Sequence, residues 1–160
     1  WLGPIVDQRA VDRHQAAVAD ARRDGTVFTG GEHLTDGDLA RGFYVEPTVV
    51  GGLPADHRLF RDELFAPLTA VHAVDSLDEA LTLANDSVYG LTAGVYTRDQ
   101  KRARKILSQV RAGSVYWNCC DRVSPRLPWS GIGHSGIGLT LSTYGIQTFT
   151  RPKAWHLRGA

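Results

Sequence analysis

Apolar residues recur at helical spacing near the start of the chain. Val11, Val18 and Ala21 fall on one side of a stretch that begins at Asp7 and stops at Gly25. An aspartate can cap the first turn of a helix, and a glycine commonly follows the last turn. The pattern therefore predicts a first helix between these two residues, with one buried face.

A second helix is predicted after Ser76-Leu77-Asp78-Glu79, which has the form of a capping box. In that motif the serine hydroxyl accepts a hydrogen bond from the glutamate amide, and the glutamate carboxylate reaches back. Asn85-Asp86 ends this helix. Its predicted buried face comprises Leu77, Ala80, Leu81 and Ala84.

A third helix is predicted over residues 99–111, and Gly113 ends it. Lys105 and Arg111 lie toward its C-terminus, where the helix dipole favours cations. Its apolar face comprises Ala103, Ile106, Leu107 and Val110.

Short β-prone segments alternate with these helices. They cover residues 26–28, 43–50, 68–74, 91–97 and 114–118. Pro47 interrupts one of them, and because proline cannot donate to a strand ladder, that segment suits an edge or a kinked strand. Residues 32–41 are polar and are predicted to form an exposed loop, while residues 153–158 are predicted to form a short terminal strand.

The order strand, helix, strand, helix, strand between residues 68 and 118 is typical of βαβ units. Such units favour a parallel or mostly parallel sheet with right-handed crossovers. The predicted fold class is therefore α/β. Residues 119–138 contain two prolines, several glycines and no periodicity, which predicts a long functional loop.

Composition narrows the classes of partner. The 160 residues amount to about one domain. A net charge of +1 creates no strong electrostatic field that would attract a nucleic acid, a membrane surface or a polyanion. No apolar run is long enough to span a membrane. The chain lacks Met and begins at Trp1, which we interpret as a fragment of a longer protein. The adjacent Cys119 and Cys120 make no disulfide framework, so we expect a reducing, cytoplasmic setting.

A glycine-rich segment has the spacing of a dinucleotide fingerprint. Residues 131–136 read Gly-Ile-Gly-His-Ser-Gly, which fits G-x-G-x-x-G. That fingerprint binds a pyrophosphate only when a strand leads directly into the glycines and a helix follows. Residues 124–128 precede it and include two prolines, which is no strand. We therefore interpret the segment as a loop whose backbone approaches something closely.

The cysteines are candidates for covalent chemistry. Cys119 or Cys120 would be the nucleophile, with His134 or His156 as its base. The alternative is a small buried apolar residue after a strand. We favour the alternative, because nothing in the local sequence lowers a thiol pKa or supplies an oxyanion site. No zinc site is predicted, since the spacings typical of zinc ligands are absent.

A pair of carboxylates lies between two apolar pairs. Asp62-Glu63 is flanked by Leu59-Phe60 and Leu64-Phe65 and is followed by Ala66-Pro67. One reading is a positioned carboxylate that binds hydroxyls of a sugar or a substrate. The other is a charge at a helix end, and the residues alone leave both open.

Six segments, taken in order along the chain, resemble the motifs of the aldehyde dehydrogenases. Residues 61–67, for example, read R-D-E-L-F-A-P and resemble the family's E-E-I-F-G-P. Residues 112–118 read A-G-S-V-Y-W-N and resemble A-G-x-V-x-x-N. The matching segments are Gly3–Asp7, Gly42–Thr48, Arg61–Pro67, Asn85–Leu91, Ala112–Asn118, and Pro128–Gly131 followed by Ser135-Gly136.

The resemblance implies an enzyme that oxidises an aldehyde to a carboxylic acid with NAD or NADP. Residues 1–149 would belong to the C-terminal part of its catalytic domain, and residues 150–160 would form a terminal oligomerisation strand. In the family, a cysteine nucleophile and a glutamate base lie upstream of the segment that Gly3-Pro4 resembles. The resemblance therefore implies that this chain holds no catalytic residue and is inactive alone. It also implies a homo-oligomer, a dimer or a tetramer, assembled through the C-terminal strand.

Some family roles fall on residues of this chain. Glu63 matches the glutamate that holds the nicotinamide ribose hydroxyls, and Phe65 matches the aromatic residue beside the nicotinamide. Arg13 lies near a position that can contact the cofactor. These roles follow from the resemblance alone.

The substrate tunnel of the family supplies three more matches. Asp121 and Val123 fall in the loop that lines it, and Trp129 matches one of its aromatic residues. Trp129 replaces the usual Phe and Ser130 the usual Gly, while Ala66 replaces another Gly. The larger Trp129 leaves the class of aldehyde undetermined.

Two alternatives to the enzyme remain. One is a truncated, non-catalytic paralogue. The other is a stand-alone interaction module that pairs with its partners through the C-terminal strand.

Overall fold

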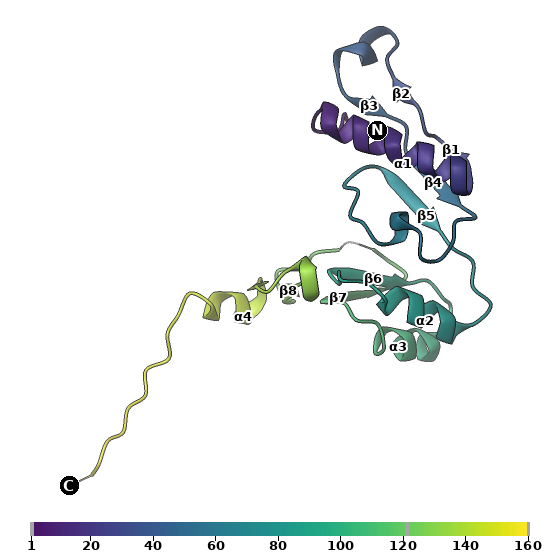
Figure 1. The fold of residues 1–160 in the computed structure, drawn as a ribbon. Helices are drawn as coiled ribbons and strands as arrows, with labels where there is room; N and C mark the ends of the chain where they lie inside the picture. The colour runs from purple at the N-terminus through teal and green to yellow at the C-terminus, as the bar shows by residue number, and fades with distance from the viewer. Residues whose placement is uncertain (1, 121, 160) are drawn as a thin grey trace. The chain divides into compact units, whose positions relative to one another are not determined.

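The computed structural model describes residues 2–120 and 122–159. It divides into two units, Trp1–Asp75 and Ser76–Ala160, each with its own helices and strands. Figure 1 labels the elements of both units.

The first unit opens with the predicted first helix, α1 (Gln8–Asp24). The Asp7 carboxylate caps it by accepting a hydrogen bond from the Ala10 amide at 2.8 Å. The Gly25 amide donates to the Ala21 carbonyl at 2.9 Å and ends the helix. Val11, Val18 and Ala21 are all buried, so the predicted cap, end and face are confirmed.

A three-stranded sheet lies beside α1. Its strands are β1 (Thr26–Thr29), β4 (Thr48–Gly51) and β5 (Leu68–Val71), in the order β1-β4-β5. β4 runs antiparallel to β1 and parallel to β5. The predicted edge position for this segment is therefore wrong, because β4 is central. Pro47 comes just before β4, so its missing N–H costs the ladder nothing.

A smaller, two-stranded sheet precedes Pro47 in the chain. β2 (His33–Leu34) and β3 (Tyr44–Val45) are antiparallel, and a 3₁₀ turn, η1 (Gly37–Arg41), connects them. The predicted kink at Pro47 is confirmed, since β3 ends before it and β4 begins after it. The prediction of a plain loop over residues 32–41 is wrong in part, because β3 gives β2 a partner.

The core of the first unit lies between α1 and the sheet. Ala17 and Ala21 of α1 pack with Val50, Leu53 and Leu59. Leu59 belongs to the 3₁₀ turn η2 (Arg58–Phe60). Burying a side chain of the size of Val50, Leu53 or Leu59 stabilises the fold by roughly 1.5–3 kcal/mol. This burial fixes the start of the segment that leads to β5.

The second unit contains the predicted βαβ element. β6 (Thr92–Val95) and β7 (Ser114–Trp117) are parallel, and α3 (Gln100–Leu107) connects them. The α/β class is therefore confirmed, with parallel pairs in both units and antiparallel pairs beside them.

α3 ends earlier than predicted. Its last residue is Leu107, so Arg111 lies beyond the helix. The side chains of Ser108 and Gln109 each donate to the Lys105 carbonyl at 2.9 Å, which satisfies an acceptor that a longer helix would have used. The Arg111 amide donates to the Asn85 side chain at 2.7 Å instead of continuing the helix.

The remaining helix of this unit is α2 (Leu77–Asn85). The Ser76 hydroxyl accepts from the Glu79 amide at 3.1 Å, as the capping box predicts. Leu81 is buried and Ala80 is half-buried, but Ala84 is exposed, so the predicted face is wrong at that residue.

The predicted loop over residues 119–138 contains short elements. β8 (Trp129–Ser130) pairs antiparallel with β9 (Leu139–Thr140), and the 3₁₀ turn η3 (Gly133–Ser135) lies between them. α4 (Ser142–Gln147) follows.

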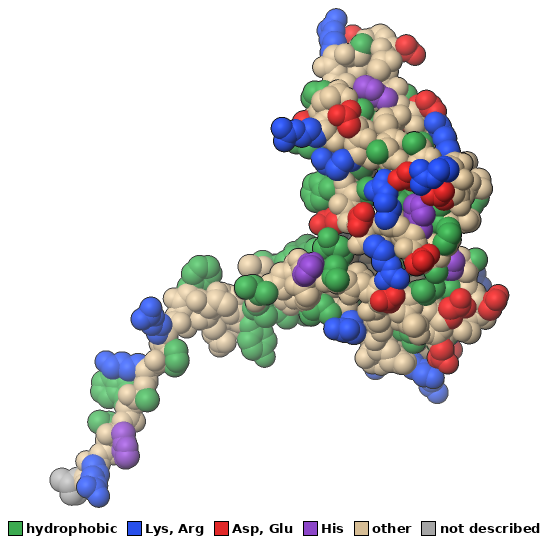
Figure 2. All heavy atoms as spheres, viewed as in Figure 1, with side chains coloured by type: hydrophobic (Ala, Val, Ile, Leu, Met, Phe, Trp, Pro, Cys, Tyr) green, Lys and Arg blue, Asp and Glu red, His purple; other side chains and the backbone are tan. Residues whose placement is uncertain are grey.

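Residues 150–159 form an extended segment without secondary structure (Figure 1). The predicted strand over residues 153–158 is therefore not formed here, because no neighbouring strand accepts or donates its hydrogen bonds. Trp155 and Leu157 are 71% and 79% exposed, so they do not fold back onto the sheets of this chain. Hydrophobic side chains stand out along this segment in Figure 2.

Candidate functional site

The segment between η2 and β5 presents two of the residues that the sequence singled out. Leu64 packs against the core, while Glu63 before it and Phe65 after it are exposed. Phe65 has a φ of +51°, in the left-handed region that bulky residues rarely adopt. This conformation allows Leu64 to point inward and leaves the Phe65 ring 79% exposed. A backbone of this kind costs on the order of 1–3 kcal/mol and persists only where the surroundings enforce it.

The Glu63 carboxylate is free to bind a ligand. Within the part of the chain that the structure describes, it makes no hydrogen bond and no ion pair. A carboxylate accepts hydrogen bonds through two oxygens and can take two neighbouring hydroxyls at once. Glu63 lies beyond the end of η2, so it does not serve that helix end, and its role as a ligand-binding carboxylate remains a prediction.

Arg13 of α1 reaches the same segment. Its Nε donates to the Leu64 carbonyl oxygen at 3.4 Å. The first unit thus brings Arg13, which is distant in the sequence, to the segment that carries Glu63 and Phe65. Their contacts with a cofactor remain a prediction.

An apolar hollow of about 450 Å³ lies beside Phe65. It is lined by residues 2–6 from the start of the chain and by Phe65, Ala66 and Pro67. The Ile5 amide donates to the Phe43 carbonyl at 2.8 Å, which fixes the opening segment. The sequence analysis did not anticipate this wall, although the matching Gly3-Pro4 motif was the signal that could have indicated it.

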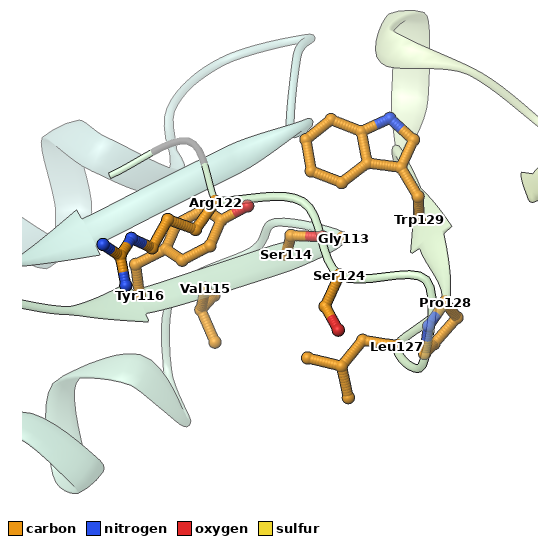
Figure 3. Close-up of a pocket in the computed structure, with 9 residues that line it drawn as sticks. All are labelled: Gly113, Ser114, Val115, Tyr116, Arg122, Ser124, Leu127, Pro128 and Trp129. Carbon is orange, nitrogen blue, oxygen red and sulfur yellow. The ribbon is translucent and has the colours of Figure 1, made fainter. Parts of the chain in front are cut away.

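A second hollow, of about 200 Å³, belongs to the second unit (Figure 3). Trp129 of β8 lines it, together with Tyr116 of β7 and Arg122. Its full lining is Gly113, Ser114, Val115, Tyr116, Arg122, Ser124, Leu127, Pro128 and Trp129. The hollow therefore combines aromatic and aliphatic walls with one cation.

The three predicted tunnel residues differ in their placement. Trp129 lines the hollow, whereas Val123 is 57% exposed and does not. Asp121 lies outside the described residues. Sequence reasoning missed Tyr116 and Arg122, because they line a common hollow with Trp129 only through the folding of residues 113–129. The tunnel itself remains a prediction.

The glycine-rich loop packs against the segment before β6. The Gly90 amide donates to the Ser135 hydroxyl at 2.9 Å, and the His134 amide donates to the Val88 carbonyl at 2.8 Å. Gly133 has a φ of +57°, and a Cβ there would lie 2.3 Å from the Val88 carbonyl oxygen. The interpretation of a close backbone approach is confirmed, and what the loop approaches is residues 88–90.

The two cysteines are free and differ in exposure. Cys119 is half-buried, while Cys120 is exposed, so the interpretation as buried apolar residues is wrong for Cys120. A hydrogen bond with Cys120 and partial desolvation raise the pKa of the Tyr96 hydroxyl. The His134 ring lies edge-on to Tyr89, with 6.0 Å between the ring centroids.

In residues 2–120 and 122–159, no group of three or more His, Cys, Asp and Glu side chains is arranged to hold a metal ion. Over the same residues, no helix combines the length and the apolar character that crossing a bilayer requires.

Comparison with known proteins gives a consistent match. The family model described as the aldehyde dehydrogenase family matches residues 1–155. A mitochondrial aldehyde dehydrogenase of Leishmania tarentolae is 35% identical over 156 residues, which cover 97% of this chain and 30% of that protein. A chloroplastic betaine aldehyde dehydrogenase of Beta vulgaris is 33% identical over 156 residues, with 95% and 30% covered. The chain thus spans about 30% of the length of the curated relatives it matches.

Solved structures give the same result. Betaine aldehyde dehydrogenase from Staphylococcus aureus, in complex with NAD⁺, superposes with a TM-score of 0.86 at 29% identity. The match covers 92% of this chain and 29% of that one. A double mutant of that enzyme, also with NAD⁺, has a TM-score of 0.87 at 27% identity and covers 98% of this chain and 34% of its own.

Proposed function

We propose, from the premise that this chain belongs to the aldehyde dehydrogenase family, that it is the C-terminal part of an NAD(P)-dependent aldehyde dehydrogenase. The enzyme would oxidise an aldehyde to the carboxylic acid. In this proposal the chain contributes a cofactor-holding segment and part of the substrate tunnel, while the nucleophile and the base come from the rest of the enzyme. The observation that carries the proposal is the match of family motifs and fold over nearly the whole chain.

The geometry around Glu63 supports a cofactor role. Its carboxylate has no partner within the described residues. Both of its oxygens are therefore available to accept hydrogen bonds from the two ribose hydroxyls. The exposed Phe65 ring, held at a positive φ, offers a flat apolar surface next to it. NAD or NADP, when bound, supplies the oxidant. The residues of this chain would hold it: Glu63 by hydrogen bonds, Phe65 by contact with the ring, and Arg13 by charge.

The substrate side rests on the hollow beside Trp129. Its apolar and aromatic lining suits the carbon chain of a small aldehyde, and Arg122 adds a cation. We assign Asp121, Val123 and Trp129 to the tunnel on the strength of the family match. The S. aureus enzyme and the plant relatives are named for betaine aldehyde or aminoaldehydes, so the first panel of aldehydes should include these together with neutral aldehydes, which Arg122 would not repel.

Location and assembly follow from the same proposal. We keep a cytoplasmic location as the working hypothesis, although relatives are named for mitochondria, chloroplasts and peroxisomes. We also propose a homo-oligomer, a dimer or a tetramer, in which residues 150–160 join a sheet of a neighbouring subunit.

The experiment that tests the function is an activity assay on two proteins. The full-length protein should reduce NAD or NADP in the presence of an aldehyde, as followed by absorbance of the reduced nicotinamide. The isolated 160-residue chain should show no turnover above background, because it lacks the nucleophile and the base in the family's places. Turnover by the isolated chain that disappears in Cys119→Ala or Cys120→Ala would contradict the proposal. Inactivity of the full-length protein with a broad panel of aldehydes would favour the non-catalytic alternative.

A further inference from the structure

One edge of α1 contacts the segment that carries Glu63 at three points. Arg13 donates to the Leu64 carbonyl at 3.4 Å, Asp20 accepts from Arg58, and Asp24 lies 3.2 Å from His57 Nε2. The three helix residues are spaced by seven and by four positions, which places them along one side of a helix. The segment is therefore attached to α1 along its length and not at one end alone.

Arg58 is the central residue of this attachment. Its Nε donates to Asp20 Oδ2 at 2.6 Å, and its Nη2 forms an ion pair with the same oxygen. Its Nη1 lies 3.8 Å from Asp62 Oδ2. The Asp62 amide donates to the Arg58 carbonyl at 2.8 Å. Arg58 therefore links the helix to the residue that immediately precedes Glu63, through both its side chain and its backbone.

The surroundings make this contact stronger than an ordinary surface ion pair. The Asp20 side chain is only 19% exposed, and Arg58 approaches it with two nitrogens. The hydrogen bond from Arg58, followed by the one from Arg23, holds the pKa of Asp20 below its usual range. Asp20 is ionised at neutral pH, as aspartates ordinarily are, and its two contacts with Arg58 hold that side chain in place.

Apolar anchors act on both sides of the carboxylates. Leu59 is in the core, and Leu64 packs against it. Between them, Asp62 and Glu63 are exposed, and burial does not fix them. The orientation of this short exposed stretch depends on polar contacts on either side of Glu63. Arg58 contacts Asp62 before it, and Arg13 donates to the Leu64 carbonyl after it.

We propose that Arg58 is a positioning residue for Glu63: by bridging Asp20 of α1 and Asp62, it fixes the backbone that aims the Glu63 carboxylate. This inference rests on the proposed cofactor role of Glu63. Arg58 does not touch the ligand; it acts by restricting the segment. Because a misplacement of about 1 Å can cost on the order of a hundredfold in rate, a partial loosening should be visible in the kinetics.

Arg23 provides a matched control. It also donates to Asp20, at 2.7 Å, but its other partner is Asp24, and it makes no contact with residues 58–65 among those described. Arg23→Gln therefore removes the same charge, one bond to the same carboxylate and two bonds to Asp24. It leaves in place the contacts that Asp20 makes with Arg58 and that Asp24 makes with His57. Arg58→Lys keeps the charge but loses the two-nitrogen contact with Asp20. It replaces Arg58→Gln in the measurements if Arg58→Gln does not fold.

The first measurement is amide hydrogen exchange of peptides covering residues 58–67 in the full-length protein. Arg58→Gln should speed exchange there about tenfold, which corresponds to a loss of roughly one charge-assisted hydrogen bond. Arg23→Gln should leave these peptides within about twofold of the parent protein. Equal exchange in the two variants would overturn the proposal, whatever the role of Glu63.

The second measurement is the single-turnover rate of nicotinamide reduction, with the cofactor dissociation constant measured in parallel. Arg58→Gln should slow the rate by about tenfold with a smaller effect on cofactor binding, and Arg58→Lys should lie in between. In a Glu63→Gln background the same change should have almost no further effect. If Arg58→Gln slows the rate in the Glu63→Gln background as much as it does in the parent protein, Arg58 does not act through Glu63, and the proposal is overturned. If Glu63→Gln itself changes nothing, the cofactor role fails, and the exchange experiment alone decides whether Arg58 positions the segment.

Discussion

Phe65 shows how the backbone of one residue decides what a segment presents. At a φ of +51°, it turns the chain so that Leu64 enters the core and the aromatic ring leaves it. The sequence analysis identified Glu63 and Phe65 because they belong to a contiguous motif. It did not identify Arg58, because the partner of Arg58 is 38 residues away on α1. Long-range pairing of exposed side chains leaves no periodic signal in a single sequence.

His14 is a second residue whose role is visible only in three dimensions. Its side chain is fully buried, Nε2 lies 3.0 Å from the Thr48 hydroxyl, and Nδ1 lies 3.2 Å from the Gln15 amide nitrogen. The Thr48 hydroxyl in turn donates to the Glu46 carbonyl at 2.8 Å. These partners suit a neutral ring with its proton on Nε2. Burial is the main cause that lowers the pKa of His14 below its ordinary value of 6.5.

The lowered pKa of His14 predicts a loss of stability on mild acidification. Below pH 6.5 the unfolded chain binds a proton that the folded chain does not, so the free energy of unfolding should fall as the pH drops. Urea unfolding of the chain between about pH 5 and 7 measures this, since the carboxylates titrate mainly below that window. His14→Gln, which can keep a donor toward Thr48, should flatten the dependence, and His156→Gln in the exposed C-terminal segment should not. A pH dependence that is unchanged in His14→Gln would contradict this account.

At the scale of elements, local signals located helix starts better than helix ends. Asp7 and Ser76 cap their helices as predicted, because a cap involves residues within one turn. α3 ends at Leu107 because Ser108 and Gln109 take up the Lys105 carbonyl and Arg111 bonds to Asn85, which comes from another helix. Strand pairing was equally non-local: nothing near Pro47 indicates that β4 lies between β1 and β5.

The C-terminal segment, residues 150–159, pairs with no strand among the residues that the structure describes. Lys153 lies over the Trp155 ring at 5.1 Å, as expected for alternate residues of an extended chain on one side. Trp155 and Leu157 share that side and are exposed. An extended, apolar segment of this kind is normally covered.

Deleting the residues after Pro152 from the full-length protein should break up its oligomer. Burying a Trp and a Leu contributes roughly 1.5–3 kcal/mol for each side chain, so losing both should weaken association by several kcal/mol. The molar mass in solution, measured by sedimentation or light scattering, tests this. The double variant Trp155→Ala and Leu157→Ala should have the same effect, whereas His156→Ala on the other side should not. An unchanged oligomer after the deletion would show that this segment is not the intersubunit element.

At the scale of the whole molecule, the residues of interest fall on two separately described units. Arg13, Glu63 and Phe65 belong to the first, and Val123 and Trp129 belong to the second. The order of the family motifs along the chain predicted which segments matter, because each motif is short and contiguous. It could not predict the hollow beside Phe65, because its wall joins that residue to the distant residues 2–6. Nor could it predict the hollow beside Trp129, because its wall depends on how residues 113–129 fold back on themselves.

The claim that Glu63 holds the cofactor is tested most directly by the single-turnover rate of nicotinamide reduction in Glu63→Gln. The full-length protein is mixed with saturating cofactor and aldehyde, and reduced nicotinamide is followed in the first turnover. The account predicts a rate reduced by on the order of a hundredfold with a much smaller change in cofactor affinity, because the amide no longer orients the ribose. Glu32→Gln, an exposed glutamate of the same unit that pairs with Arg22, should behave like the unaltered protein. A first-turnover rate in Glu63→Gln equal to that of the Glu32→Gln control would contradict the account.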